Sequence, residues 1–136
     1  MTDVDTLQAA LQQVFAPWVQ QLEMRVLEAR TGEVVFALPV LPRHVHAGGV
    51  MCGQTLMAAA DTSMVLAIMT HLGEFKPMTT VQMQTSFLRP IAAGSADARL
   101  TSRVLRMGKT IVFGEVEIAD AAGRLAAHAT TTYALL

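Results

Sequence analysis

The sequence predicts an α+β fold in which an antiparallel sheet of five to six strands curves around one long central helix. From Gln54 to His71 the chain is apolar almost all the way round a helix, as expected of a helix surrounded by protein. After Gly73, which ends this helix, strand-like segments follow one another with short turns between them. A buried helix without a second helical layer needs a sheet curved around it.

Two elements are expected before this helix. Apolar residues at three- and four-residue spacing predict a first helix over about residues 5–21, with Thr6 as a plausible N-cap. Pro17 falls inside that range, where it removes one backbone hydrogen bond. The period then changes, and the turn around Gly32 predicts a β-hairpin that ends before Pro39.

Four further strands are expected after the central helix, which we place at about residues 54–72. They cover residues 79–88, 96–106, 110–118 and 124–135. The connections contain Gly94, Gly108 and Gly123, and such tight turns predict that each strand pairs with the one before it.

Composition narrows the class of protein. The 136 residues fit a single domain spanning 1–136, and 52% of them are hydrophobic, so we expect another copy of the chain to cover some apolar surface. A net charge of −1 without a basic run argues against nucleic-acid binding. One cysteine and an acidic N-terminus suggest a reducing, cytoplasmic setting without export. Asp61 interrupts the one apolar run long enough for a membrane span, so we expect no membrane helix.

Asp61 is the first candidate catalytic residue. It is the only carboxylate, Lys or Arg side chain between Arg43 and Glu74, and it stands on the apolar helix. A carboxylate there is costly unless something pairs with it or uses it, as a general base would. A structural role, capping a loop or facing a subunit interface, is the alternative.

The entrance to the same helix is the second candidate. Gly48, Gly49 and Gly53 let the backbone approach a ligand, and the first N–H groups of a helix are unsatisfied donors at its positive end. Such donors can stabilise the oxyanion of a carbonyl under attack. A flexible loop before a helix is the plainer interpretation.

The spacing of the two candidates has a consequence for assembly. Gly53 and Asp61 are eight residues apart, which is about 12 Å along one helix. A catalytic base must come within about 3 Å of its target or reach it through one water. Asp61 could therefore serve a carbonyl held at Gly53 only across a two-fold axis, with two such helices antiparallel. A functional role for both features predicts a homodimer at least, and the apolar composition favours further assembly into a homotetramer.

Three segments resemble the hotdog-fold acyl-CoA thioesterases, and within them the phenylacetate-degradation-type (PaaI-like) branch. These are residues 46–61, residues 79–90 and the turn at residues 106–110, and the resemblance covers about residues 30–135. His46 stands where that family commonly has Asn, and Cys52 where it has His.

The resemblance implies hydrolysis of an acyl-CoA to free acid and CoA, without a cofactor or metal. Gly53 N–H would polarise the carbonyl with His46 nearby, Asp61 would be base or nucleophile, and Thr80 would help to hold the attacking water. The family's substrate-binding positions fall on Gly49 and Gln54 at the helix entrance, and on Arg89, Arg106, Gly108 and Lys109 near the CoA phosphates.

Other functions use the same residues. A hotdog-fold hydroxyacyl thioester dehydratase would place its histidine at His44, but its helix glutamate falls on Ala58. A non-catalytic acyl-CoA binding protein would need no poised carboxylate. His44, His46 and Asp61 could ligate a metal, and Cys52 could be a nucleophile, although neither has an evident completing partner. The preferred acyl group, aromatic or medium-chain, is not determined by the sequence.

Overall fold

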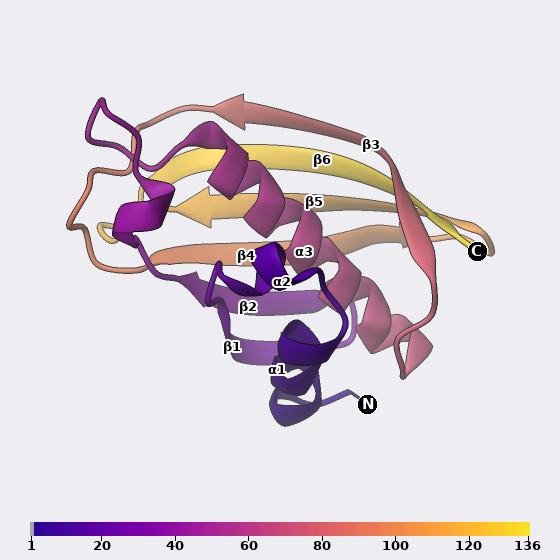
Figure 1. Cartoon of the computed structure of the whole chain (residues 1–136). Coiled ribbons are helices and arrows are strands. Elements are labelled where there is room, and N and C mark those ends of the chain that lie inside the picture. The colour runs from indigo at the N-terminus through magenta and orange to yellow at the C-terminus, as the bar shows by residue number, and fades with distance from the viewer. Residues whose placement is uncertain (1) are drawn as a thin grey trace.

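The structure is a computed structural model that describes residues 2–136. Within this range three α-helices, one short 3₁₀ helix and six strands form, and one sheet curves around α3 (Figure 1). This arrangement confirms the predicted fold class. The helices are α1 (Val4–Gln13), α2 (Pro17–Gln20), η1 (Pro42–His44) and α3 (Gly53–Leu72), and the strands are β1 (Arg25–Arg30), β2 (Glu33–Leu38), β3 (Met78–Phe87), β4 (Ala98–Met107), β5 (Ile111–Ala119) and β6 (Leu125–Leu135).

The strand order is β1-β2-β4-β5-β6-β3, with every neighbouring pair antiparallel. The predicted pairing of β3 with β4 is therefore wrong, because β3 pairs with β6 at the sheet edge and β4 lies between β2 and β5. The connection at residues 88–97 is not a tight turn. It crosses the end of the sheet and binds the loop before α3, where Met51 N–H donates to the Ile91 carbonyl at 2.8 Å. The other predicted hairpins form as expected.

The N-terminal helix is broken where one helix over residues 5–21 was predicted. Pro17 starts α2 instead of continuing α1, and Ala16 before it has an extended ψ of 148°. Proline disfavours helical backbone in the residue that precedes it, which explains the break. The cap of α1 is also not Thr6, because Asp3 accepts the Thr6 N–H at 2.9 Å.

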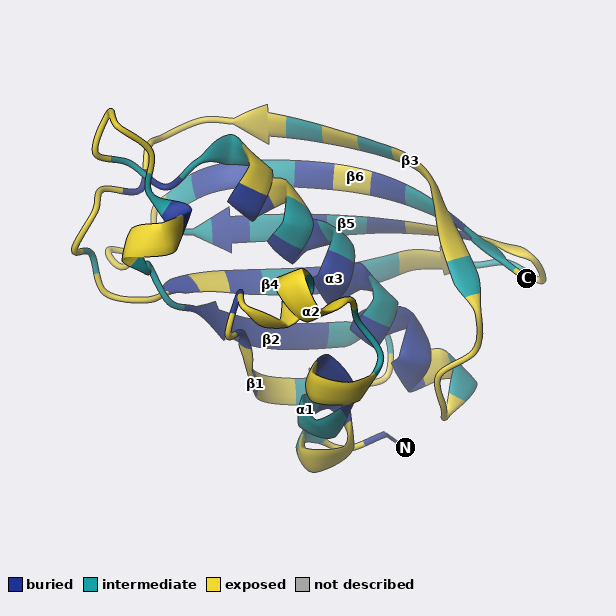
Figure 2. Cartoon of the chain, in the orientation of Figure 1, coloured by how far each residue is buried: buried dark blue, intermediate teal, exposed yellow. Residues whose placement is uncertain are grey.

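α3 forms the core of the molecule. Most of its residues are buried (Figure 2), and their side chains pack with those of the sheet in one hydrophobic core. At Gly114 the contact is so close that a Cβ would lie 2.3 Å from the Met64 methyl group. By length and hydropathy this helix could also cross a membrane, but 72% of the relevant window is buried inside the protein. One stripe of α3 stays at least partly exposed, formed by Gln54, Met57, Ala58, Asp61 and Val65.

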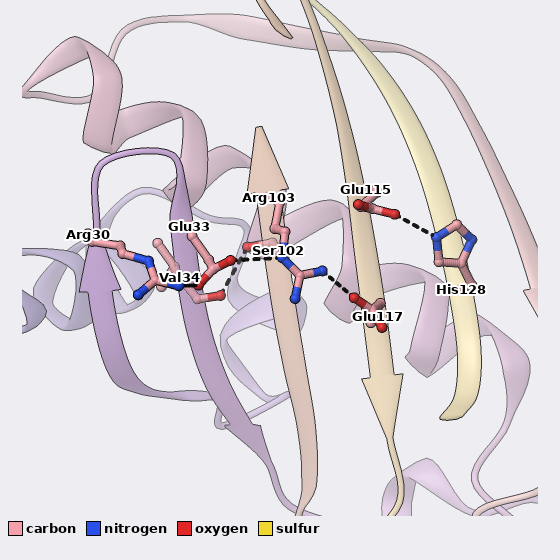
Figure 3. A network of polar contacts seen from close by, with 8 residues as sticks. All are labelled: Arg30, Glu33, Val34, Ser102, Arg103, Glu115, Glu117 and His128. Carbon is pink, nitrogen blue, oxygen red and sulfur yellow. Dashed lines mark hydrogen bonds and ion pairs between the residues drawn. The ribbon is translucent and has the colours of Figure 1, made fainter. Parts of the chain in front are cut away.

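The outer face of the sheet carries a network of charged side chains (Figure 3). Glu33 on β2 binds Arg30 and Arg103, and Arg103 on β4 also binds Glu117 on β5. A separate pair joins Glu115 and His128 at 3.0 Å. The network and this pair together connect neighbouring strands from the β1–β2 hairpin to β6, and neither includes the edge strand β3.

Candidate active site

Asp61 lies half-buried on the partly exposed stripe of α3. Its carboxylate Oδ1 accepts a hydrogen bond from Thr80 Oγ1 at 2.7 Å. The same oxygen accepts a hydrogen bond from the Tyr133 hydroxyl, which also lies 2.8 Å from the Asp61 backbone carbonyl oxygen. Among the described residues no hydrogen bond reaches Oδ2. The sheet therefore holds one oxygen of the carboxylate and leaves the other available.

The register of β3 and β6 brings these groups together. Thr80 lies opposite Tyr133 in the ladder, so two hydroxyl groups from neighbouring strands point to the same place on α3. A bulge follows directly, between Thr80 and Gln82. Side chains alternate along a strand, so without the bulge Thr80 and Phe87 would face opposite sides of the sheet. With it, Phe87 pairs with the buried Ala127 and faces α3 as Thr80 does.

Tyr133 is 1% exposed. Burial, followed by the charge of Asp61 and the hydrogen bond to it, raises the pKa of Tyr133 far above its ordinary value. The phenol therefore keeps its proton across the pH range in which enzymes work, and it remains a hydrogen-bond donor to Asp61.

The N-terminus of α3 presents free donors beside a cavity. Cys52 precedes the helix without a side-chain cap, and no hydrogen bond within the described chain uses the N–H groups of Gly53 or Gln54. A cavity of about 290 Å³ opens here, lined mainly by apolar side chains with Arg89 at its rim. The Phe87 ring forms one wall, because a Cβ on Gly53 would lie 3.3 Å from it. An apolar cavity beside free N–H donors can hold an apolar group next to a carbonyl that accepts those donors.

The loop before α3 is organised by His46. Its Nδ1 accepts the Gly48 N–H at 2.8 Å, and its carbonyl accepts the Gly49 N–H at 2.9 Å. An Nδ1 that accepts a hydrogen bond leaves Nε2–H as the donor of the exposed ring. Gly49 has φ of +80°, a backbone conformation that favours glycine. His46 thus lies in the loop at the entrance of the helix, and its predicted role as an orienting donor stays a prediction.

The predicted site residues fall into two groups, one at the N-terminal end of α3 and one near its middle. Gly53, Gln54, His46, Gly49 and Arg89 lie at its N-terminal end, where Phe87 packs on Gly53. Asp61 and Thr80 lie two helical turns further along, beside Tyr133. One chain does not bring the two groups together, as the 12 Å rise between Gly53 and Asp61 predicts.

The turn at Arg106, Gly108 and Lys109 belongs to the group of residues around Asp61 and Tyr133. Gly108 N–H donates to the Ile111 carbonyl at 3.0 Å, and the next residue, Val112, pairs with Tyr133. A Cβ on Gly108 would lie 2.3 Å from that Ile111 oxygen, which explains the glycine. Arg106 and Lys109 are exposed. Arg89 belongs to the other group and donates to the Leu125 carbonyl at 3.1 Å.

Comparison with known proteins assigns a family to this arrangement. The model of the thioesterase superfamily matches residues 48–127, more than half of the chain. The chain belongs to the thioesterase superfamily. A protein of Thermoplasma volcanium named as an esterase is 36% identical over 106 residues, covering 78% of this chain and 77% of that protein. Human acyl-coenzyme A thioesterase 13 is 28% identical over 112 residues, covering 81% and 78%.

Solved structures of thioesterase-superfamily proteins share this fold. Zebrafish thioesterase superfamily member 2 superposes with a TM-score of 0.88 at 26% identity over the full length of both chains. The Escherichia coli PaaI protein, from the phenylacetic acid degradation operon, gives a TM-score of 0.82 at 19% identity, covering 95% of this chain and 91% of that one. The predicted resemblance to the PaaI-like hotdog thioesterases is confirmed.

His44 and Cys52, the residues named for alternative functions, both make local contacts. His44 is buried, and its backbone carbonyl accepts the Cys52 N–H at 2.8 Å. Cys52 Sγ contacts Thr55 Oγ1 at 3.0 Å. Within residues 2–136 no three His, Cys, Asp or Glu side chains form a cluster that could hold a metal ion, and His44, His46 and Asp61 are not brought together.

Two residues of the site were missed by the sequence analysis. Tyr133 is the single tyrosine of the chain, and it lies 72 residues from Asp61 in the sequence, so only the strand register reveals the contact. Phe87 lies inside the segment that resembles the family, but its position beside Gly53 depends on the bulge in β3.

Proposed function

We propose that this protein hydrolyses acyl-CoA thioesters at sites shared between the two subunits of a homodimer. The observation that carries the proposal is the environment of Asp61. Its carboxylate lies on the open stripe of α3, bound on one oxygen by Thr80 of the edge strand and unbound on the other. The oxygen that no residue of the described chain binds is available to act on a substrate or a water.

The surface around Asp61 supports the dimer. β3 is an edge strand of ten residues without a charged side chain, and most of its length is exposed. Exposed apolar side chains lie on this strand and directly after it, including Val81, Phe87 and Leu88, each more than half exposed. Unprotected edges of this kind pair with another strand. Antiparallel pairing of β3 with its copy across a two-fold axis would cover them and bring the two open stripes of α3 together.

Such a dimer completes each site. With two α3 helices antiparallel, Asp61 of the partner subunit faces the Gly53 end of this chain, and the reverse holds at the second site. The turn at Arg106–Lys109 contributes to the same site as Asp61 of its own subunit, because both lie at the same end of the sheet. Each site then has an oxyanion donor, apolar cavity and Arg89 from one subunit, and a carboxylate and two exposed cations from the other.

The chemistry follows from this placement. The thioester carbonyl oxygen accepts the Gly53 N–H. Asp61 of the other subunit takes a proton from a water held at Thr80 while the water oxygen attacks the carbonyl carbon. Alternatively, Asp61 attacks the carbonyl carbon itself to form an anhydride that water then cleaves. The carbon–sulfur bond breaks, the CoA thiolate takes up a proton, and the free acid leaves. The helix N-terminus stabilises the negative charge that develops on the carbonyl oxygen.

The acyl carrier is proposed from two observations. The human relative is named as an acyl-coenzyme A thioesterase. The exposed cations at Arg106 and Lys109 have no ion-pair partner within the described chain and could bind the phosphates of CoA. The acyl group would occupy the cavity of about 290 Å³ beside Phe87.

The first test measures thiol release from aromatic, short, medium and long acyl-CoAs, then compares wild type with Asp61→Asn on the best substrate. The amide keeps the shape and removes the base, so kcat should fall by about 100-fold or more with an unchanged melting temperature. Agreement of the two proteins within about threefold would contradict a catalytic Asp61. Binding of acyl-CoA without turnover would indicate a non-catalytic binding protein.

The shared site has its own test. Gly53→Pro removes the proposed oxyanion N–H at a helix position that accepts proline, and no intrachain hydrogen bond is lost. Both Gly53→Pro and Asp61→Asn should be inactive alone. Random reassembly of an equal mixture gives heterodimers with one intact site each, which should restore about a quarter of wild-type activity. No recovery after confirmed subunit exchange would rule out a site that combines the two residues across the interface.

A further inference from the structure

We propose that Tyr133 is a positioning residue that fixes the Asp61 carboxylate so that Oδ2 is the reacting oxygen. The inference rests on the proposed function, because it assumes that Asp61 acts on the thioester. It adds a residue that neither the sequence motifs nor the family resemblance indicated, and it distinguishes the two oxygens of the carboxylate.

The geometry gives the two oxygens different environments. Oδ1 accepts hydrogen bonds from Thr80 on β3 and from Tyr133 on β6, while no residue of the described chain binds Oδ2. Two donors on the same oxygen restrict rotation of the carboxylate about its Cβ–Cγ bond. Oδ2 is then held in a fixed direction on the open stripe of α3.

The two donors are not equivalent. Thr80 lies on the exposed edge strand, so its hydroxyl can also reach water. Tyr133 is 1% exposed, and its hydroxyl is held by the Asp61 backbone carbonyl at 2.8 Å as well as by the carboxylate. The Tyr133 side chain therefore ties the carboxylate to the α3 backbone and to β6, an interior strand of the sheet. Thr80 is left to position water.

This anchoring matters because reacting groups must be placed closely. A carboxylate that is free to rotate spends part of its time out of line with its target, and misplacement by about 1 Å can cost a large factor in rate. The Tyr133 hydroxyl removes this freedom before the substrate arrives. It never touches the substrate, so its loss should lower kcat and leave KM nearly unchanged.

The first experiment compares Tyr133→Phe with wild type. The ring is kept and only the hydroxyl is removed, so kcat should fall by about tenfold while KM stays within about twofold. The matched control is Thr131→Val, which removes a buried hydroxyl without a hydrogen-bond partner from the same strand. The control should keep wild-type kcat. Equal losses in both variants would overturn the proposal, because they would reflect general damage to β6.

A double-mutant cycle distinguishes positioning from independent effects. In the Asp61→Asn background, Tyr133→Phe should lower the residual rate by less than about twofold, because no carboxylate remains to be positioned. A further tenfold loss in that background would overturn the inference. If Asp61→Asn is inactive but Tyr133→Phe retains full kcat, the inference fails and the proposed function stands. If Asp61→Asn is fully active, the proposed function fails first.

A spectroscopic test does not depend on activity or on the stability of Tyr133→Phe. Tyr133 is the single tyrosine of the chain, so growth on 3-fluorotyrosine labels this position alone and gives one ¹⁹F resonance. Asp61→Asn should shift this resonance, because the acceptor of the phenol hydrogen bond changes from a carboxylate to an amide. Thr131→Val should leave it nearly unmoved. A resonance that does not respond to Asp61→Asn would overturn the contact on which the inference rests.

Discussion

The two edges of the sheet are built in different ways. β1 is six residues long, and its charged side chains Arg25, Glu28 and Arg30 are all paired, with Asp97, Arg99 and Glu33. α1 packs against this strand. β3 is ten residues long, has no charged side chain, and is exposed along most of its length. Natural proteins protect free edges with charges and covering elements, so β1 is a protected edge and β3 is an unprotected one.

The candidate catalytic residues follow the same division. Thr80 lies on β3, and Asp61 lies on the stripe of α3 beside it. The charged network of the outer face lies on the other strands (Figure 3). The unprotected edge and the candidate site thus coincide. Burial of that edge by a second subunit would shield Asp61 from bulk solvent and bring in the Gly53 end that a single chain cannot supply.

The largest expected effect comes from placing a charge on each edge in turn. Val81→Lys on β3 should prevent dimer formation and lower activity by at least about 100-fold, because each lysine would be buried unpaired near its copy. Leu27→Lys on β1 is the matched control. The two side chains have similar exposure, 58% and 41%, but β1 is not expected to pair. Sedimentation velocity and thiol release measure both consequences.

Two outcomes would break the comparison between the edges. An active, stable monomer after Val81→Lys would end the shared-site mechanism. Dissociation by Leu27→Lys instead would move the interface to the β1 edge, where Asp61 has no part in it.

A smaller effect on substrate affinity is expected from the two cations near Asp61. Replacing Arg106 or Lys109 by Gln should raise KM for an acyl-CoA by about threefold each, more at low salt, and leave kcat unchanged. The control is Arg99→Gln, at the opposite end of β4 and paired with Glu28. An acyl N-acetylcysteamine thioester lacks the CoA phosphates and should show no dependence on these cations. Equal KM changes with both substrates would contradict a phosphate-binding role.

Much of the fold was predictable because local patterns decide it. The apolar run after Gly53 gave the central helix, and turns at Gly32, Gly108 and Gly123 gave three hairpins. The β3–β4 pairing failed because residues 88–97 contain turn-forming residues but are fixed by contacts with the distant loop before α3. Tight turns predict neighbours only when the connection has no other partner.

The site was predictable in part. Asp61 stood out as a lone carboxylate on an apolar helix, and Gly53 as the start of that helix. The contacts that complete the site depend on register: Thr80 meets Tyr133 through the β3–β6 ladder, and Phe87 meets Gly53 only because a bulge shifts the alternation of β3. A shift of one residue exchanges the two faces of a strand, and no local pattern in the sequence locates the bulge.

The smallest expected effect is a pH dependence of stability on the protected side of the molecule. His44 is buried near Arg43 and Gln21, away from β3. Burial, and then the charge of Arg43, lowers the pKa of His44 below its ordinary value of 6.5. The unfolded chain therefore takes up this proton at a higher pH than the folded chain does. The stability that neutral His44 contributes is complete above pH 6.5 and is lost as the pH falls through its lowered folded-state pKa.

Urea unfolding at several pH values between about 7.5 and 5 measures this effect. The midpoint of wild type should fall with pH, and His44→Gln should flatten that fall because the titrating group is gone. His71→Gln, an exposed position at the end of α3, should keep the wild-type slope because His44 remains. Oligomeric state should not change with any of these substitutions if assembly depends on β3. An unchanged slope in His44→Gln would show that another group governs the pH dependence. Dissociation of that variant would contradict an interface at β3, because His44 lies away from that strand.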